Sequence, residues 1–382
     1  QKIWDVLGWF LAIGLLSSLH GRFGEPEAQL RWATEAHQRA QAGFGAQRPH
    51  PTLTVTERRY AEALLAAGRP ADALPLLTRA LQDRRTLDAA DTPRVLQATR
   101  VLADTLGRVG RLDAGLRLMR EAVALQGRLA PQDGTQRAAV AGQLIELLTR
   151  ARRVDEALAL DAAIAASTPS RSLADEVRHA RLLALSGQTE AAATAAEAAD
   201  RRAGDGQPAL RAQARLAAAL NARLQRRPAQ ALAWAQQVLA DPAFAGFDAA
   251  LQAAAHTEAG IAALDLGDAT VAEPTLQQAR ALYERAQVEP GVGRADTLVG
   301  LARLHLQAGD AAQAAALLQP LLQAWEATHP RSDWQGQALH WASRASAQAG
   351  QSAQARAQGA AAAALLRASR LPALKQLAAA SP

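Results

Sequence analysis

The chain of 382 residues contains no cysteine, one methionine and one asparagine, and only 4% of its residues are aromatic. Without cysteine, disulfides, thiolate nucleophiles and zinc–thiolate sites are excluded. The low content of aromatic and β-branched residues argues against a β-sheet protein, because these residues predominate in strands. A phosphate-binding lysine motif is also excluded, since Lys2 and Lys375 are the only lysines and neither follows a glycine-rich loop.

Other familiar catalytic and metal-binding patterns are missing as well. No two of the eight histidines are three or four positions apart, as a metal site on one helix requires. No Gly-x-Ser-x-Gly elbow occurs, and the acidic pair Asp155-Glu156 is explained by a helix N-terminus, where carboxylates favour the helix dipole. We therefore expect no catalytic residues, no metal and no cofactor, and we predict that the chain is not an enzyme.

Basic residues slightly outnumber acidic ones, at 42 against 36, and the net charge is +6. The two signs are interspersed along the chain and no basic block occurs, so a nucleic-acid partner is not expected. Almost all of the basic residues are arginines, which is typical of a GC-rich bacterial genome.

A turn residue recurs about every forty residues, the spacing of a solenoid of stacked repeats. It is a glycine or an arginine: Gly24, Gly68, Gly110, Arg152, Gly187, Arg226, Gly267, Gly309 and Gly350. A small residue follows most of these turns by five positions: Ala73, Gly115, Ala157, Ala192, Ala231, Ala272, Ala314 and Ala355. A missing side chain at this position lets two helices cross closely.

The pattern between these turns predicts an all-α, right-handed α-solenoid of about nine helix-turn-helix hairpins, forming a single superhelical domain over residues 1–382. Residues 1–45 are expected to form the first hairpin, residues 52–370 repeats two to nine, and residues 371–382 a C-terminal capping helix. Among the predicted helices are Thr56–Ala66, Pro93–Arg108, Thr189–Ala203, Phe247–Leu266 and Ser352–Arg370.

Residues 3–19 form the most apolar segment, interrupted by Asp5. Its 17 residues are at the lower limit of length for crossing a bilayer. We interpret it as the buried first helix of the first hairpin, with a membrane-associated segment as the alternative. The chain starts with Gln1 rather than methionine, and we expect it to be a piece of a longer protein.

The repeats resemble the tetratricopeptide repeat (TPR). The first helix of that repeat carries a large residue, a small one and a further apolar one, as in Leu102-Ala103 with Leu106. The turn glycine and the small residues of the second helix match Gly68, Ala73 and Ala80. The long period and the His50-Pro51 loop are similar to the kinesin-light-chain type, which also occurs in bacterial signalling proteins.

The resemblance implies that first helices line the concave surface of the solenoid. The family's register places the following residues there as a candidate ligand groove: Arg58, Arg100, Asp104, Arg108, Glu146, Arg150, Arg181, Arg223, Asp296, Arg303, His340 and Arg344. Arginine suits carboxylates in a bidentate geometry, so an acidic ligand is one interpretation. The alternative is a solvated face whose charges neutralise one another at helical spacing.

TPR grooves that hold extended peptides often clamp the peptide backbone with asparagines, and here only Asn221 is present. The tryptophans Trp334 and Trp341 are seven positions apart on one predicted helix face and are interpreted as core packing, with a ligand anchor as the alternative.

The resemblance implies a non-catalytic protein-interaction or sensor module within a larger bacterial signalling or regulatory protein. Its partner is expected to be a protein or peptide and its location the cytoplasm. The alternative is a scaffold tethered to a membrane through residues 3–19.

Overall fold

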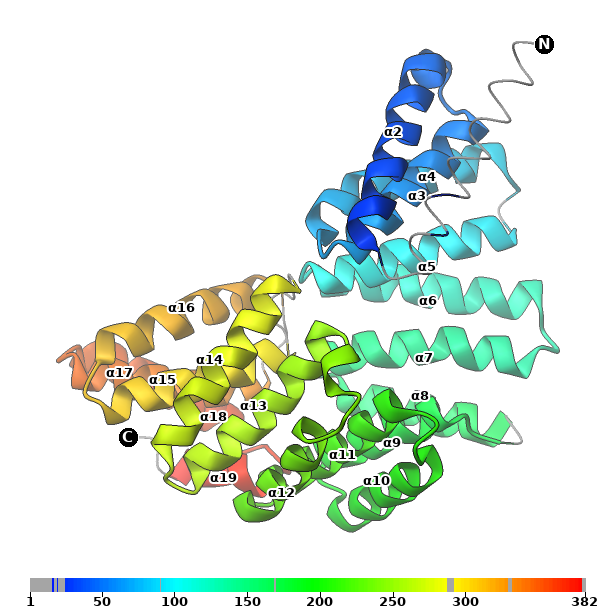
Figure 1. Ribbon diagram of the computed structural model, residues 1–382. Helices are drawn as coiled ribbons and strands as arrows, with labels where there is room; N and C mark the ends of the chain where they lie inside the picture. The colour runs from blue at the N-terminus through cyan, green and yellow to red at the C-terminus, as the bar shows by residue number, and fades with distance from the viewer. Residues whose placement is uncertain are drawn as a thin grey trace. The chain divides into compact units, whose positions relative to one another are not determined.

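The computed structural model describes residues 25–89, 91–167, 170–286, 292–328 and 332–379, with positions 16 and 19. All regular secondary structure in these ranges is helical, which confirms the predicted all-α fold (Figure 1). The chain divides into two compact units, Gln1–Leu147 and Leu148–Pro382. Whether residues 1–382 form one domain stays a prediction.

The helices of unit 1 follow one another as antiparallel neighbours. They are α2 (Pro26–Phe44), α3 (Pro51–Ala66), α4 (Pro70–Leu87), α5 (Pro93–Arg108), α6 (Leu112–Leu129) and α7 (Gly134–Arg150), whose last turn enters unit 2. Residues 3–19, predicted to form a helix, lie outside the described residues except for Leu16 and Leu19. Among the helices of the described ranges, none combines the length and apolarity that crossing a bilayer requires.

The remaining helices belong to unit 2. They are α8 (Val154–Ser167), α9 (Leu173–Ser186), α10 (Thr189–Ala203), α11 (Pro208–Leu224), α12 (Pro228–Leu239), α13 (Ala249–Asp265), α14 (Ala269–Arg285), α15 (Val292–Gln307), α16 (Ala311–Thr328), α17 (Asp333–Gln348), α18 (Ser352–Leu366) and α19 (Pro372–Ala379). The predicted helices Pro93–Arg108 and Thr189–Ala203 have the observed bounds.

Three predicted helix boundaries were wrong, each because of a local capping interaction or an early stop. The helix predicted from Thr56 begins at Pro51, where His50 Nδ1 accepts a hydrogen bond from Thr52 N. The helix predicted from Phe247 begins at Ala249, capped by Asp248. The last long helix ends at Leu366 instead of Arg370.

The turn inside each described hairpin lies where the repeat spacing predicts it and uses a left-handed residue. Positive φ angles of 58–85° occur at Gly68, Gly110, Arg152, Gly187, Arg226, Gly267, Gly309 and Gly350. At the first of these, Gly68 N donates to Leu65 O and Arg69 N to Leu64 O, the paired bonds that close a helix end. Arg226 forms the same bonds without being a glycine.

The small residue five positions after each turn is buried in every described hairpin. Ala73 and Ala314 are 0% exposed. A Cβ added to Gly115 would lie 2.8 Å from the Ala103 carbonyl oxygen of the preceding helix. Larger residues at these positions would therefore push the two helices of a hairpin apart.

Unit 2 closes on itself, although the repeat pattern alone predicts an extended array. Helix α19 packs against α11 and α17 (Figure 1). One apolar cluster joins Leu183 and Leu224, near the start of the unit, to Trp334, Leu366 and Leu374 near its end. The first-helix faces of unit 2 consequently border an interior, not an open groove.

The arginine turns give a direct test of the repeat geometry. A left-handed conformation costs a residue with a side chain about 1–2 kcal/mol more than it costs glycine. We expect the free energy of unfolding, measured by urea titration, to be about 1 kcal/mol higher for Arg226→Gly than for Arg226→Ala.

The matched pair is Gln236→Gly and Gln236→Ala, at an exposed position inside α12. There glycine is expected to be the less stable variant by about 1 kcal/mol. The same order of stability at both positions would contradict a left-handed turn at Arg226.

Candidate functional site

The residues predicted to line a ligand groove all lie on first helices, but they fall into both units. Unit 1 holds Arg58 on α3, Arg100, Asp104 and Arg108 on α5, and Glu146 on α7. Those numbered above 147 belong to unit 2: Arg150 on α7, Arg181 on α9, Arg223 on α11, Asp296 and Arg303 on α15, and His340 and Arg344 on α17.

In unit 1, α5 carries a polar stripe of Gln97, Arg100, Asp104 and Arg108, spaced three and four residues apart on one face. Arg108 Nε donates to Asp104 Oδ2 over 2.8 Å, and both side chains remain partly exposed. Arg58 on α3 is paired in the same way with Glu62. At these positions the predicted mutual neutralisation is observed.

Arg100 differs from the other arginines of this stripe. Its side chain is half-buried, and its Nε donates over 2.8 Å to the amide oxygen of Gln143 on α7. Within the described residues it has no carboxylate within ion-pair distance, and burial lowers its pKa. The guanidinium is thus partly desolvated and still lacks a counterion, which favours an incoming anion.

A pocket of about 250 Å³ opens beside this stripe, between α3, α4 and α5. Arg58, Arg84, Arg94 and Gln97 line it above a base of small residues, and none of its lining residues is acidic. We call it the arginine pocket. The role of Arg84 and Arg94 was missed from the sequence, because neither occupies the first-helix positions that the TPR register selects.

Asp88, outside the lining, partly balances the charge of the arginine pocket. It lies 3.3 Å from Arg84 and 3.7 Å from Arg94, whose side chain is 71% exposed. The Arg94 guanidinium is screened by solvent, so this longer contact contributes little to stability, and Asp88 keeps Arg84 as its partner when Arg94 moves away. Arg94 can therefore exchange Asp88 for a ligand carboxylate at small cost.

In unit 2 the corresponding arginine is part of the interior. Arg223 is 6% exposed and holds Glu258 of α13 with two bonds, Nε–Oε2 at 2.8 Å and Nη2–Oε1 at 3.1 Å. Its Nη2 also donates over 2.7 Å to Asp296 of α15. Burial alone would lower the pKa of Arg223, but the two carboxylates outweigh it and the pKa is raised.

Arg152, which occupies a turn position, contacts the other end of unit 2. Its guanidinium lies 3.8 Å from the ring centroid of Trp334, a cation–π contact. Burial lowers the pKa of Arg152 to about 10, so it stays charged at neutral pH. The strain of a left-handed arginine is thus offset by a contact that a glycine would lose.

The aromatic residues of α17 lie against the same interior. Trp334 is 4% exposed, in agreement with core packing. Trp341 has Arg303 and Arg344 over its ring, at 5.2 and 5.4 Å from the centroid. His340 is 1% exposed, and burial, aided by the positive charge of Arg344, lowers its pKa to about 4. Arg223 and His340 are therefore not presented to solvent.

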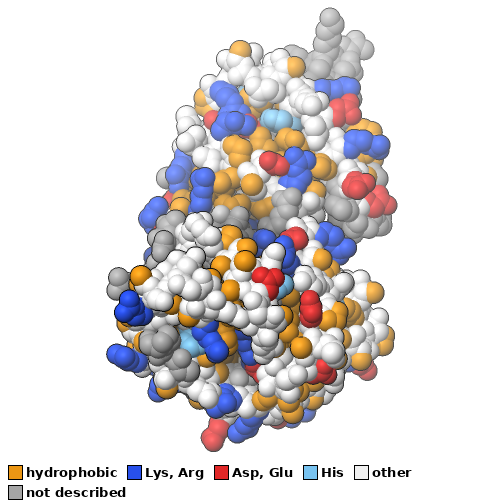
Figure 2. Space-filling model, turned by 90° about the vertical axis from the view of Figure 1, so that its left-hand side faces the viewer, with side chains coloured by type: hydrophobic (Ala, Val, Ile, Leu, Met, Phe, Trp, Pro, Cys, Tyr) orange, Lys and Arg blue, Asp and Glu red, His pale blue; other side chains and the backbone are white. Residues whose placement is uncertain are grey.

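Charge on the outer surface is dispersed. Figure 2 shows Lys and Arg side chains separated by Asp, Glu and uncharged residues across the face in view. In the part of the chain that the structure describes, no group of three or more His, Asp or Glu residues is arranged to hold a metal ion.

No family model matches the sequence, and no curated protein is similar to it. Among solved structures, the chain is similar to TPR-like repeats of a putative kinesin light chain from Podospora anserina (16% identity, 72% of this chain and 95% of that one, TM-score 0.30). It is similar to a tetratricopeptide repeat protein from Parabacteroides merdae (13% identity, 75% of this chain and 98% of that one, TM-score 0.41). A Rap protein complexed with Competence and Sporulation Factor is also similar (12% identity, 97% of this chain and 95% of that one, TM-score 0.46).

The described hairpins, with a left-handed turn residue and a buried small residue five positions later, have the helix-turn-helix architecture that the tetratricopeptide-repeat resemblance predicts.

The interior ion pairs of unit 2 predict a large effect on stability. Arg223→Ala leaves Glu258 and Asp296 buried without their partner, and we expect a loss of about 3–5 kcal/mol in the free energy of unfolding. The control is Arg285→Ala, an exposed arginine at the end of α14, which should change it by less than about 0.5 kcal/mol. Equal effects in urea titrations would show that Arg223 is solvated.

His340 predicts a pH dependence of stability. The unfolded chain takes up a proton at this residue near pH 6.5, but the folded chain does so only near pH 4. Stability from this residue is therefore complete above pH 6.5 and is lost as the pH falls toward 4, by about 3 kcal/mol.

We expect His340→Gln to remove this part of the acid sensitivity when unfolding is compared at pH 7 and pH 4.5. Other groups, including the half-buried His256, titrate alike in both proteins. The difference in free energy of unfolding between wild type and variant therefore reports on His340 alone. If this difference is the same at pH 7 and at pH 4.5, His340 is not a neutral, buried imidazole.

Proposed function

We propose that the chain is a non-catalytic protein-interaction module whose unit 1 recognises an acidic segment of a partner protein. The observation that carries this proposal is Arg100, a half-buried guanidinium whose polar contact, Gln143, is neutral. A carboxylate can replace a neutral amide at a guanidinium with a shorter, stronger, bidentate contact. Binding an acidic side chain would supply the counterion that Arg100 lacks.

The arginine pocket supports the same ligand class. It adjoins the stripe of α5 through Gln97, and its volume of about 250 Å³ suits one acidic side chain and its backbone. A second carboxylate of the same segment would reach Arg94 there. Unit 1 contains no asparagine, so recognition of the acidic segment there rests on these charge-assisted contacts instead of an asparagine clamp on the peptide backbone.

The finer assignment rests on the TPR resemblance. Under it, the chain serves as a sensor or interaction module of a larger bacterial signalling or regulatory protein. The absence of cysteine agrees with a reducing compartment, and a cytoplasmic location is part of the proposal.

The test uses a fluorescein-labelled glutamate decamer as the acidic probe and a glutamine decamer as its neutral counterpart. We expect the glutamate probe to bind and to dissociate as salt rises, because exposed charges are screened over about 8–10 Å at ordinary ionic strength. Arg94→Gln/Arg100→Gln should weaken binding at least tenfold, the effect of losing one or two charge-assisted hydrogen bonds.

The matched control removes two exposed arginines without a side-chain partner among the described residues, Arg111→Gln/Arg117→Gln. It has the same net charge as the test variant and should bind as the wild type does. If both double variants lose affinity equally, attraction is general and Arg100 is not the binding residue.

A further inference from the structure

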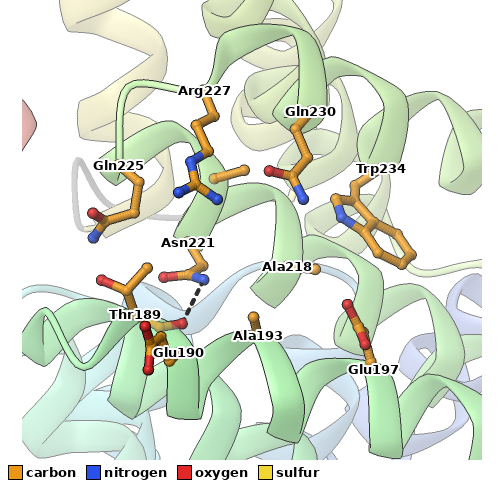
Figure 3. A pocket seen from close by; sticks show the side chains of 11 residues that line it. Thr189, Glu190, Ala193, Glu197, Ala218, Asn221, Gln225, Arg227, Gln230 and Trp234 are labelled. Atoms are coloured by element: carbon orange, nitrogen blue, oxygen red, sulfur yellow. Dashed lines mark hydrogen bonds between the residues drawn. The ribbon is translucent and has the colours of Figure 1, made fainter.

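A second pocket, of about 220 Å³, lies in unit 2 between α10 and α12, the second helices of two successive hairpins. Figure 3 shows its arrangement, with α11 between the two helices. We call it the α10–α12 pocket. Its hollow exists because Ala193, Ala218 and Ala222 occupy positions where longer side chains would fill the space.

Two buried polar groups in this pocket have no hydrogen-bond partner among the described residues. Asn221 is 6% exposed, and its Nδ2 donates to the Thr189 carbonyl over 3.0 Å, which fixes the orientation of the amide. Its Oδ1 is left without a donor, and one turn further along α11 the Nε2 of Gln225 is left without an acceptor. Buried polar groups are nearly always paired, so unpaired ones in a pocket indicate a ligand that supplies the partners.

The chemistry of this pair fits a peptide backbone. An acceptor and a donor about one helical turn apart complement the N–H and C=O groups of an extended chain. An anion could accept from Gln225 Nε2 and pair with Arg227, but it would offer no donor to Asn221 Oδ1, whereas a peptide unit satisfies both a donor and an acceptor.

The end of the pocket at Glu197 and Trp234 adds a preference for positive charge, whereas Arg227, the one basic residue of the lining, lies near Gln225 and Asn221 at the other end (Figure 3). Glu190 and Glu197 are exposed and stand two turns apart on α10, and neither has a basic partner among the described residues. Trp234 of α12 faces Glu197 across the pocket (Figure 3). A carboxylate beside an aromatic ring is a setting for a lysine or arginine side chain, which combines an ion pair with a cation–π contact.

The length of the pocket limits the ligand. Seven residues of helix between Glu190 and Glu197 correspond to about 10 Å, the span of about three extended residues. We propose that the α10–α12 pocket binds an extended peptide segment of about three residues that carries a basic side chain, with its backbone on Asn221 and Gln225 and its cation between Glu197 and Trp234.

The probe is the end-blocked pentapeptide Ala-Ala-Lys-Ala-Ala, compared with the same peptide carrying Glu in place of Lys. Titration of the full chain, followed by saturation-transfer NMR, should give a Kd at least tenfold lower for the lysine peptide. Glu190→Gln/Glu197→Gln should weaken its binding about tenfold, while Glu273→Gln, an exposed glutamate of α14 without a recorded partner, should leave it unchanged.

Asn221→Ala tests the backbone contact and should weaken both peptides, provided that circular dichroism shows the helices intact. Arg94→Gln/Arg100→Gln should not affect the lysine peptide, so failure here and failure of the acidic-ligand function are distinguishable. Three results would overturn the proposal: no binding of either peptide, as expected if water alone fills the pocket; equal affinity for both; or binding unaffected by Glu190→Gln/Glu197→Gln.

Discussion

Each repeat of this protein depends on the close crossing of its two helices at a residue with little or no side chain. Ala73, Ala231 and Ala314 are completely buried at these crossings, and Gly115 has no room for even one methyl group. The left-handed turn five positions earlier fixes the angle at which the second helix returns. Stacking of hairpins, and hence every surface between them, follows from this contact.

The same first-helix register produces different environments for arginine. In unit 1 the polar stripe of α5 is accessible, and Arg100 is left with a neutral partner. In unit 2, Arg223 is the centre of a buried ion-pair network with Glu258 and Asp296 of the first helices that follow it. Burial decides the role: an exposed guanidinium can exchange partners, whereas a buried one that loses its partners destabilises the fold.

Much of the fold could be predicted from the sequence because its determinants are local. A turn residue and a small residue five positions apart identify a hairpin, and even the arginines at positions 152 and 226 form turns with the left-handed conformation of the glycines. The ion pair between Arg223 and Asp296 joins residues 73 positions apart. No periodic pattern specifies which distant repeats meet, so the closure of unit 2 could not be predicted.

The candidate sites show the same limit. The TPR register selected Arg58 and Arg100 correctly as first-helix residues, but it could not include Arg84, which reaches the arginine pocket from a second helix. The register did not identify the α10–α12 pocket either. From the sequence, Asn221 was noted only as the single asparagine available to clamp a peptide backbone. Only the structure shows that Asn221 Nδ2 donates to the Thr189 carbonyl and that Oδ1 of the same amide is therefore left unpaired.

The central claim is that first-helix arginines are available to a ligand in unit 1 and committed to the fold in unit 2. Native-state labelling of arginine with phenylglyoxal, resolved by mass spectrometry, tests it directly. The account predicts rapid labelling of Arg94, protection of Arg94 and Arg100 by the glutamate decamer, and labelling of Arg223 only at the rate of unfolding. Labelling of Arg223 as fast as that of Arg94 would contradict it.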